Sequence, residues 1–466
     1  MRVDTQGQGR VRAIHSRRWR SRAAVCVLLA CAPTTFAQTG DGDLLAVCND
    51  ALQNNAGYRA ARAEYQAARE LLPQAQGKLL PQLGLRAQYD WLHEHITGDY
   101  FGVIGIDRED HFDQSSYGVR LTQALYRPDA VLAKQQAALR VQQAELKLRA
   151  AQDQLLLEVA EAYFTALAAE DALRFARAET LALREQLAQV RSREAAGLAI
   201  DAHVKAAQAQ LQLALARETE AVDAIANALT RLEALAGRPY SRLRGLPPNL
   251  TLLPPQPADV EVWTARAERD NPWIRLQHLG VDLAALGHER ARKAEWPVLD
   301  LLADAFRLDA GGGAAGERDE DQTRIGVVMT LPLYAGGQVE ATKRQTLALQ
   351  SQAAAELDDV RARVLRDTRI AYRNSASGLL RVEAHKRALD AAIAAEASTR
   401  GGFEAGTLSN TDLLTAIERR YEAERDHANA RYRFLMASLR LKSLAGNLLV
   451  ADLAQINRVL EAPGPP

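Results

Sequence analysis

Residues 151–200 read AQDQLLLEVAEAYFTALAAEDALRFARAETLALREQLAQVRSREAAGLAI, a run rich in strong helix formers such as Ala, Leu, Gln, Glu and Arg. The wider stretch 129–236 contains no proline and a single glycine, Gly197. Because a proline inside a helix costs about 3 kcal/mol, its absence permits very long helices. The stretch predicts a helix over about residues 129–195, a turn at Gly197 and a second helix to about residue 235.

The first of these predicted helices is far longer than a typical globular helix. About 67 residues at a rise of 1.5 Å per residue make a rod on the order of 100 Å long. Apolar side chains recur along it at helical spacing, at Leu156, Val159, Ala160, Tyr163 and Leu167. This stripe, together with many alanines that permit close approach, predicts coiled-coil packing.

The plan of the first half recurs in the second. Tyr372 lies 209 positions after Tyr163 in the sequence, and Gly406 lies 209 positions after Gly197. The triplet Leu-Ala-Gly that ends the first helical pair also recurs at this offset. We interpret the pattern as an internal duplication. The second half therefore carries predicted helices over about residues 338–404 and 409–445.

Each half opens with strand-like alternation of apolar and polar residues, which is typical of a transmembrane strand with lipid on one face and water on the other. A half-buried soluble hairpin gives the same pattern, and aromatic residues near the strand ends favour the membrane. The predicted membrane-facing residues are Leu83, Leu85, Val119, Leu121, Leu299, Leu301, Val327 and Leu331. Four strands per chain are too few to close a barrel, so several chains must contribute to one wall, as a homo-oligomer.

The first residues predict an exported protein. Basic residues precede an apolar run and a small-residue cut after Ala37, which is typical of a secretory signal peptide over residues 1–37. Lipidation of Cys31 is the alternative reading of the same segment. The remaining chain, 38–466, is predicted to be a single unit with four parts: repeat one over about 43–237, a Pro-rich link over 239–257, repeat two over about 258–446, and a short tail to 466.

Composition and motifs give no support to an enzyme, a cofactor site or a nucleic-acid binder. The 58 basic and 58 acidic residues cancel, so no net field attracts nucleic acid. The glycines of 311–316 fit a G-x-G-x-x-G pattern, but a strand pattern follows where a nucleotide site needs a helix, so we predict a loop. His93, His95 and His111 could coordinate a metal ion, yet without a supporting cluster we favour solvated loop histidines and no metal site.

Four local motifs support a family resemblance. They are Leu80-Pro81-Gln82-Leu83, Ala162-Tyr163-Phe164, Leu331-Pro332-Leu333-Tyr334-Ala335-Gly336-Gly337 and Ala428-Asn429-Ala430-Arg431-Tyr432. With the duplicated order of strands and long helices, the chain resembles the TolC family of outer-membrane efflux and secretion ducts. The resemblance implies a mixed α and β membrane protein: a trimeric 12-stranded transmembrane β-barrel continuous with a long periplasmic α-helical coiled-coil barrel. It also implies location in the outer membrane of a Gram-negative bacterium.

The resemblance further implies where a partner docks and where the duct closes. A periplasmic adaptor (membrane fusion) protein would dock at the turns Ala196-Gly197-Leu198 and Ala405-Gly406-Thr407. Asp412 would supply a lumen-facing gate carboxylate, while Thr415 and His203 stand where the family has acidic residues. Asp412 can alternatively be an ordinary first-turn acid favoured by the helix dipole.

The function that follows is a passive conduit in a tripartite efflux or type I secretion system. Its implied partners are two other copies of the chain, the adaptor, an inner-membrane transporter and outer-membrane lipid. The alternative from another class is a periplasmic coiled-coil spacer with a soluble β-cap and no pore.

Overall fold

The computed structural model describes residues 41–100, 104–247, 250–313 and 316–460. The predicted signal peptide, Cys31 and the last residues of the predicted tail lie outside the described residues. Within the described ranges, no helix is both long enough and apolar enough to cross a membrane.

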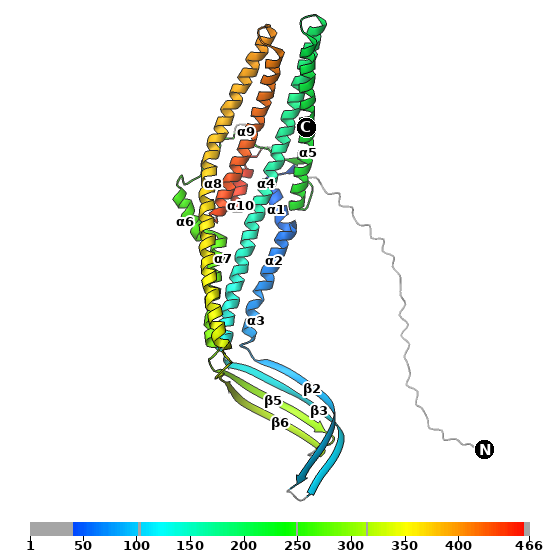
Figure 1. The fold of residues 1–466 in the computed structure, drawn as a ribbon, viewed down its shortest axis with the longest axis vertical. Coiled ribbons are helices and arrows are strands. Elements are labelled where there is room, and N and C mark those ends of the chain that lie inside the picture. Colours follow the sequence, from blue (N-terminus) through cyan, green and yellow to red (C-terminus); the bar gives the residue numbers. More distant parts are fainter. Residues whose placement is uncertain (1–40, 101–103, 248–249, 314–315, 461–466) are drawn as a thin grey trace, which may run out of the picture. The chain divides into compact units, whose positions relative to one another are not determined.

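Two long helical hairpins dominate the fold, as the sequence predicts (Figure 1). The first joins α4 (Pro128–Ala195) to α5 (Asp201–Ala236), and the second joins α8 (Gln338–Glu404) to α9 (Asn410–Leu444). The longer helix of each pair has 68 or 67 residues and the shorter 36 or 35. Pro128 occupies the first helical position of α4, where its missing N–H has no intrahelical partner to lose. The two hairpins contact each other mainly through α4 and α9, and α5 also contacts α9.

Shorter helices cover the part of each long helix that its hairpin partner does not reach. Along α4 these are α1 (Leu44–Asn54), α2 (Ala56–Arg69) and α3 (Leu71–Gly77), and along α8 they are α6 (Val260–Asp270) and α7 (Pro272–Lys293). The helix α10 (Val450–Asn457) packs on α1, and the two-residue strands β1 (Asp41–Gly42) and β4 (Arg242–Leu243) pair in parallel.

The duplication is visible in individual hydrogen bonds. Asn55 caps α2 and donates its side-chain amide to the carbonyl of Leu235, at 3.4 Å. Asn271 caps α7 and donates to the carbonyl of Leu444, at 2.9 Å. Each asparagine therefore joins the start of one helix to the end of another, and the two junctions occupy corresponding places in the two halves.

The largest hydrophobic core lies where α1, α4, α5, α9 and α10 meet. It includes Tyr163, whose hydroxyl donates to the carbonyl of Arg244 at 2.8 Å, and Phe164, which stacks on Tyr432. A second core, at the turn end of the two hairpins, contains Leu187, Val204 and Leu413. Burial of apolar surface at about 25 cal/mol per Å² is what holds these long helices in place.

One antiparallel sheet contains the four long strands in the order β2-β3-β5-β6. They are β2 (Gln82–Tyr100), β3 (Ile104–Tyr126), β5 (Val298–Ala310) and β6 (Arg318–Thr330). Figure 1 shows the four strands side by side, with the β2–β3 hairpin extending beyond β5 and β6. The last register pair between β3 and β5 is Gln114 with Ala310, so the outer part of the β2–β3 hairpin is a two-stranded ribbon.

The register places the predicted membrane-facing residues on one face of the sheet. Leu83 lies opposite Leu121, Leu85 opposite Val119, and Leu301 opposite Val327. Directly paired residues point to the same side, so these side chains form one apolar belt. The other face carries the charged and amide side chains Arg86, Gln88, Asp90, Arg120, Asp304 and Arg324, with Leu302, Phe306 and Val328 as apolar exceptions.

Leu331 is the exception among the predicted strand residues. The strand β6 ends at Thr330, so Leu331 lies one residue beyond it. The following residue, Pro332, has no N–H to donate to a ladder and disfavours continuation of the strand.

Candidate gate and docking turns of the helical hairpins

Both hairpin turns have the same backbone geometry. In the first, the N–H of Gly197 donates to Glu194 and that of Leu198 donates to Arg193, both at 2.8 Å. In the second, Gly406 donates to Phe403 at 3.2 Å and Thr407 to Gly402 at 2.9 Å. This is the Schellman motif, which needs a left-handed residue after the helix end. Both glycines supply it, with φ of 73° and 75°.

The six residues predicted as docking turns are all exposed. Leu198 keeps 78% of its surface accessible, which is unusual for a leucine. A Cβ added at Gly197 or Gly406 would meet no atom within 4 Å. The turns therefore present backbone and an apolar side chain to the solvent, and their glycines are needed for backbone conformation rather than for close packing.

Asp412 lies in the first turn of α9 and forms a capping box with Ser409. The Asp412 carboxylate accepts from the Ser409 N–H at 2.9 Å and from the Ser409 hydroxyl at 2.6 Å. In return the Asp412 N–H donates to the Ser409 oxygen at 3.1 Å. These hydrogen bonds hold the pKa of Asp412 below its ordinary value, so the carboxyl stays charged in mildly acidic solution.

Thr415 of α9 and His203 of α5 are the other two candidate gate residues. The Thr415 hydroxyl donates to the carbonyl of Thr411 within its own helix, at 2.9 Å. His203 accepts a hydrogen bond at its backbone carbonyl from Asn410, at 3.3 Å. The structure therefore brings His203 close to the start of α9 through its main chain.

A buried polar contact that the sequence analysis did not identify joins the two hairpins beside the turns. Asn410 is almost fully buried, and its side-chain oxygen accepts from Gln186 of α4 at 2.8 Å. Because its amide group also donates to His203 of α5, Asn410 connects α9 to both helices of the other hairpin. Nearby, the Arg193 guanidinium donates to the carbonyl of Phe403 at 3.2 Å and lies over the Phe403 ring.

Further from the turns, a charged cluster crosses the same interface. Glu179 of α4 is fully buried and accepts from Arg217 of α5 at 2.6 Å and from Arg425 of α9 at 3.3 Å. Arg217 also reaches Glu418 of α9 at 3.3 Å. Burial raises the pKa of the Glu179 carboxyl, and the two guanidinium groups oppose that rise. The buried charge therefore depends on both arginines.

A sequence signal for this cluster did exist. Glu179 and Gln186 fall on the same helical stripe as Ala176, Leu183 and Val190, all of which are buried. A polar side chain on an apolar stripe becomes buried and then needs a hydrogen-bonding partner. Such positions therefore indicate polar contacts with a neighbouring helix. The identity of the partners on α9, Asn410 and Arg425, which are more than 200 residues away, could not be read from the stripe.

The glycine pattern has no phosphate-binding geometry. The described glycines Gly311–Gly313 and Gly316 lie in the connection between β5 and β6, and a strand follows them. His93, His95 and His111 are strand residues of β2 and β3, so the prediction that they lie in a loop was wrong. The loop prediction failed because the alternation changes sense in the ribbon: polar side chains occupy the face of the apolar belt, and Leu92, Ile96 and Phe112 lie on the opposite face.

Comparison with solved structures supports the class of protein that this geometry defines. The Campylobacter jejuni CmeC outer membrane channel superposes with a TM-score of 0.77 at 16% identity, covering 90% of this chain and 90% of that one. At this identity the likeness concerns the fold. The chain therefore shares its fold, a four-stranded sheet joined to two long helical hairpins, with that outer membrane channel.

Sequence comparison gives the family. The chain belongs to the outer membrane efflux protein family, which matches residues 47–238 and 263–447. The outer membrane protein TolC of Escherichia coli K12 is 30% identical over 434 residues, covering 90% of this chain and 85% of that protein. The alkaline protease secretion protein AprF of Pseudomonas aeruginosa is 29% identical over 412 residues, covering 86% of this chain and 84% of that protein.

Family membership confirms the resemblance inferred from the four motifs and favours the channel over the periplasmic spacer. The family is non-enzymatic, and the protein is a channel of the Gram-negative outer membrane whose helices extend into the periplasm. The two matched segments correspond to the two halves of the internal duplication.

Proposed function

We propose that three copies of this chain form a closed duct that exports cargo from the periplasm to the cell exterior. An inner-membrane transporter supplies the energy, and a periplasmic adaptor docks at the turns containing Gly197 and Gly406. The duct itself is a passive conduit that is closed near its turns by contacts between the helical hairpins. The names of the relatives, efflux and protease secretion among them, favour a role in a tripartite efflux or type I secretion system.

The main support for assembly of several copies is the unequal burial of the two long helices that the duplication relates. The helix α4 buries 25 of its 68 residues, whereas its counterpart α8 buries 8 of 67. The exposed apolar residues of α8 include Leu347, Leu349, Ile370, Leu380 and Ile393. Because the halves share one plan, we infer that α8 is covered by a neighbouring copy of the chain.

The sheet supports the same assembly. Among the described strands, β2 and β6 each pair on one side only, which leaves two edges. Exposed edges of long strands favour pairing with another chain. Pairing β6 of one copy with β2 of the next would remove all edges and place the apolar belt against lipid.

The mass of the detergent-purified protein tests the assembly. We expect three chains per particle by light scattering with detergent correction. The double variant Leu349→Glu with Leu380→Glu places charge on the exposed face of α8 and should reduce the assembled fraction. The matched control Arg381→Glu changes charge at an exposed residue of the same helix and should leave the mass unchanged. A wild-type particle of a single chain would contradict the proposal.

Asp412 is proposed as a gate carboxylate in the assembled duct. Because its capping hydrogen bonds keep it ionised, three copies around one axis would attract cations. Asp412→Ala should lower the cation-to-anion permeability ratio by about twofold or more in planar bilayers. Ser409→Ala is the control, since it removes a capping partner and keeps the charge. An unchanged reversal potential in the Asp412 variant would assign the residue to helix capping alone.

A further inference from the structure

The outer ribbon of the β2–β3 hairpin carries three side chains that the proposed export function does not use. His93 of β2 and His111 of β3 are direct register partners, and Glu109 of β3 is the partner of His95. These residues lie on the same face of the hairpin as the apolar belt, beyond Trp91. The ribbon is the end of the sheet away from the helices, which places this face at the cell exterior.

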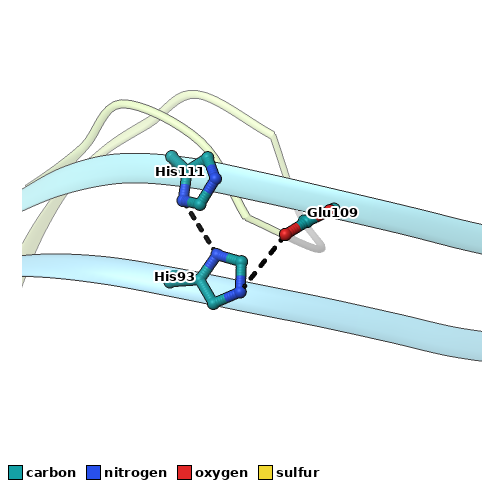
Figure 2. Close-up of side chains that lie close together, drawn as sticks. All are labelled: His93, Glu109 and His111. Atoms are coloured by element: carbon teal, nitrogen blue, oxygen red, sulfur yellow. Dashed lines mark hydrogen bonds and ion pairs between the residues drawn. The ribbon is translucent and has the colours of Figure 1, made fainter.

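The three side chains lie close together. The Nδ1 atoms of His93 and His111 lie 2.8 Å apart, and Nε2 of His93 lies 3.4 Å from Oε1 of Glu109, so His93 contacts the other two residues through different nitrogen atoms. One ligand atom from each residue falls within 4.8 Å of the others. Figure 2 shows His93 on one strand between its two contacts, with the His111 ring and the Glu109 carboxylate of the facing strand.

Stacking holds the rings in place. The His93 and His111 rings are stacked at a centroid distance of 4.3 Å, and Trp91 stacks on the other side of the pair against His111, at 5.7 Å and 4°. Two imidazoles facing each other through Nδ1 need one proton between them to avoid lone-pair repulsion. A metal ion held between the two nitrogen atoms removes that repulsion in the same way.

The donor set identifies the class of ion. Two imidazoles and a carboxylate suit zinc, copper or nickel, whereas calcium and magnesium prefer oxygen ligands alone. In a tetrahedral zinc site with bonds of about 2.0–2.1 Å, neighbouring ligand atoms are about 3.4 Å apart. The ligand atoms lie within 4.8 Å of one another, so binding of one ion through a single nitrogen of His93 requires these exposed side chains to rotate toward that spacing. Three protein ligands would leave one position for water.

The charge around the cluster also favours a cation. At the described positions of this face, from His93 to Thr97 and from Asp107 to Asp113, the residues include Asp107, Glu109 and Asp113, and none is Lys or Arg. His95 lies beside Asp107, at 3.3 Å between Nε2 and Oδ1. An anionic surface without competing basic side chains raises the local concentration of metal cations.

We propose that His93, His111 and Glu109 bind one divalent transition-metal ion of the zinc class on the outer surface of each chain. This inference reverses the preference for solvated histidines that the sequence alone gave. The ion joins the two strands of the ribbon beyond the support of β5. The β5–β6 connection supports the opposite face of the ribbon, where the Gly313 N–H donates to the Asp110 carboxylate at 2.8 Å. A two-stranded ribbon is only marginally stable by itself, so the ion adds a cross-strand link to this exterior segment.

Calorimetric titration of the detergent-purified full-length protein with zinc, prepared without a histidine tag, tests the site. We expect one Zn²⁺ per chain. His93→Ala and His111→Ala should each weaken binding by at least about tenfold, because each removes a ligand. His278→Ala on α7 is the matched control and should bind as the wild type does.

Limited proteolysis gives a second readout that is independent of transport and of assembly. Arg108 is the only Lys or Arg between Asp90 and Gln114, so trypsin has one site in the ribbon. Zinc should slow cleavage after Arg108 in the wild type and in His278→Ala, and should leave cleavage unchanged in His111→Ala. Absence of zinc binding, or equal binding and equal protection in the wild type and His111→Ala, would overturn the proposal.

Discussion

Replacing Glu179 with alanine is expected to open the duct and to lower its thermal stability. The variant leaves the guanidinium groups of Arg217 and Arg425 facing each other without the carboxylate that joins them. Removing one partner of a buried ion pair lowers the free energy of unfolding by about 3–5 kcal/mol. The two arginines are partly solvated, so we expect a loss of about 2 kcal/mol for this variant. The melting temperature should fall by roughly 5 °C.

The functional effect of the same substitution should be larger than the stability effect. Glu179 joins α4 to α5 and to α9, so its loss weakens the contact between the two hairpins near the proposed gate. We expect the mean single-channel conductance to rise severalfold. Glu418→Ala is the control, because this glutamate belongs to the same cluster but is exposed, and exposed ion pairs contribute about 0–1 kcal/mol. Equal mean conductance of the Glu179→Ala and Glu418→Ala channels would show that Glu179 does not help to close the duct.

Placing a charge at the hairpin turns is expected to abolish export while leaving the channel folded. Gly406→Glu adds a charged side chain where the structure has open space, so it obstructs a docked partner rather than the fold. The left-handed φ of 75° costs a substituted residue about 1 kcal/mol. Gly406→Asn is the matched control, since asparagine tolerates this conformation better than other side chains.

Export assays in cells that supply the transporter and adaptor would measure this effect. We expect Gly406→Glu and Gly197→Glu each to reduce export at least about tenfold, which corresponds to about 1.4 kcal/mol of lost docking free energy or more. Gly406→Asn should retain most of the activity. Undiminished export by both glutamate variants, with normal amounts of protein in the outer membrane, would place adaptor docking elsewhere.

The helical part of the fold was predictable because proline and glycine mark its ends. The predicted helix over residues 338–404 coincides with α8, and that over about 129–195 differs from α4 by one residue. Apolar alternation also placed the predicted strand residues other than Leu331 on one common face of the sheet, and contact of that face with lipid stays a prediction. It failed at the outer hairpin, where His93 and His111 occupy the face of the apolar belt and Leu92 and Phe112 lie on the opposite face, so the alternation changes sense.

The candidate site was predictable only in part. Glycine at both turns follows from local backbone chemistry, and the structure has Schellman motifs there. The contacts of Asn410 with Gln186 and of Arg193 with Phe403 join residues more than 200 positions apart, and a single sequence carries no record of such pairs. Docking at the turns and gating by Asp412 remain proposals.

The central claim, that this chain forms a gated duct through the outer membrane, is tested most directly by single-channel recording of the purified protein in a planar bilayer. We expect small, cation-selective openings from a particle of three chains, because the duct rests nearly closed at its turns. A water-soluble protein that produces no conductance would contradict this claim.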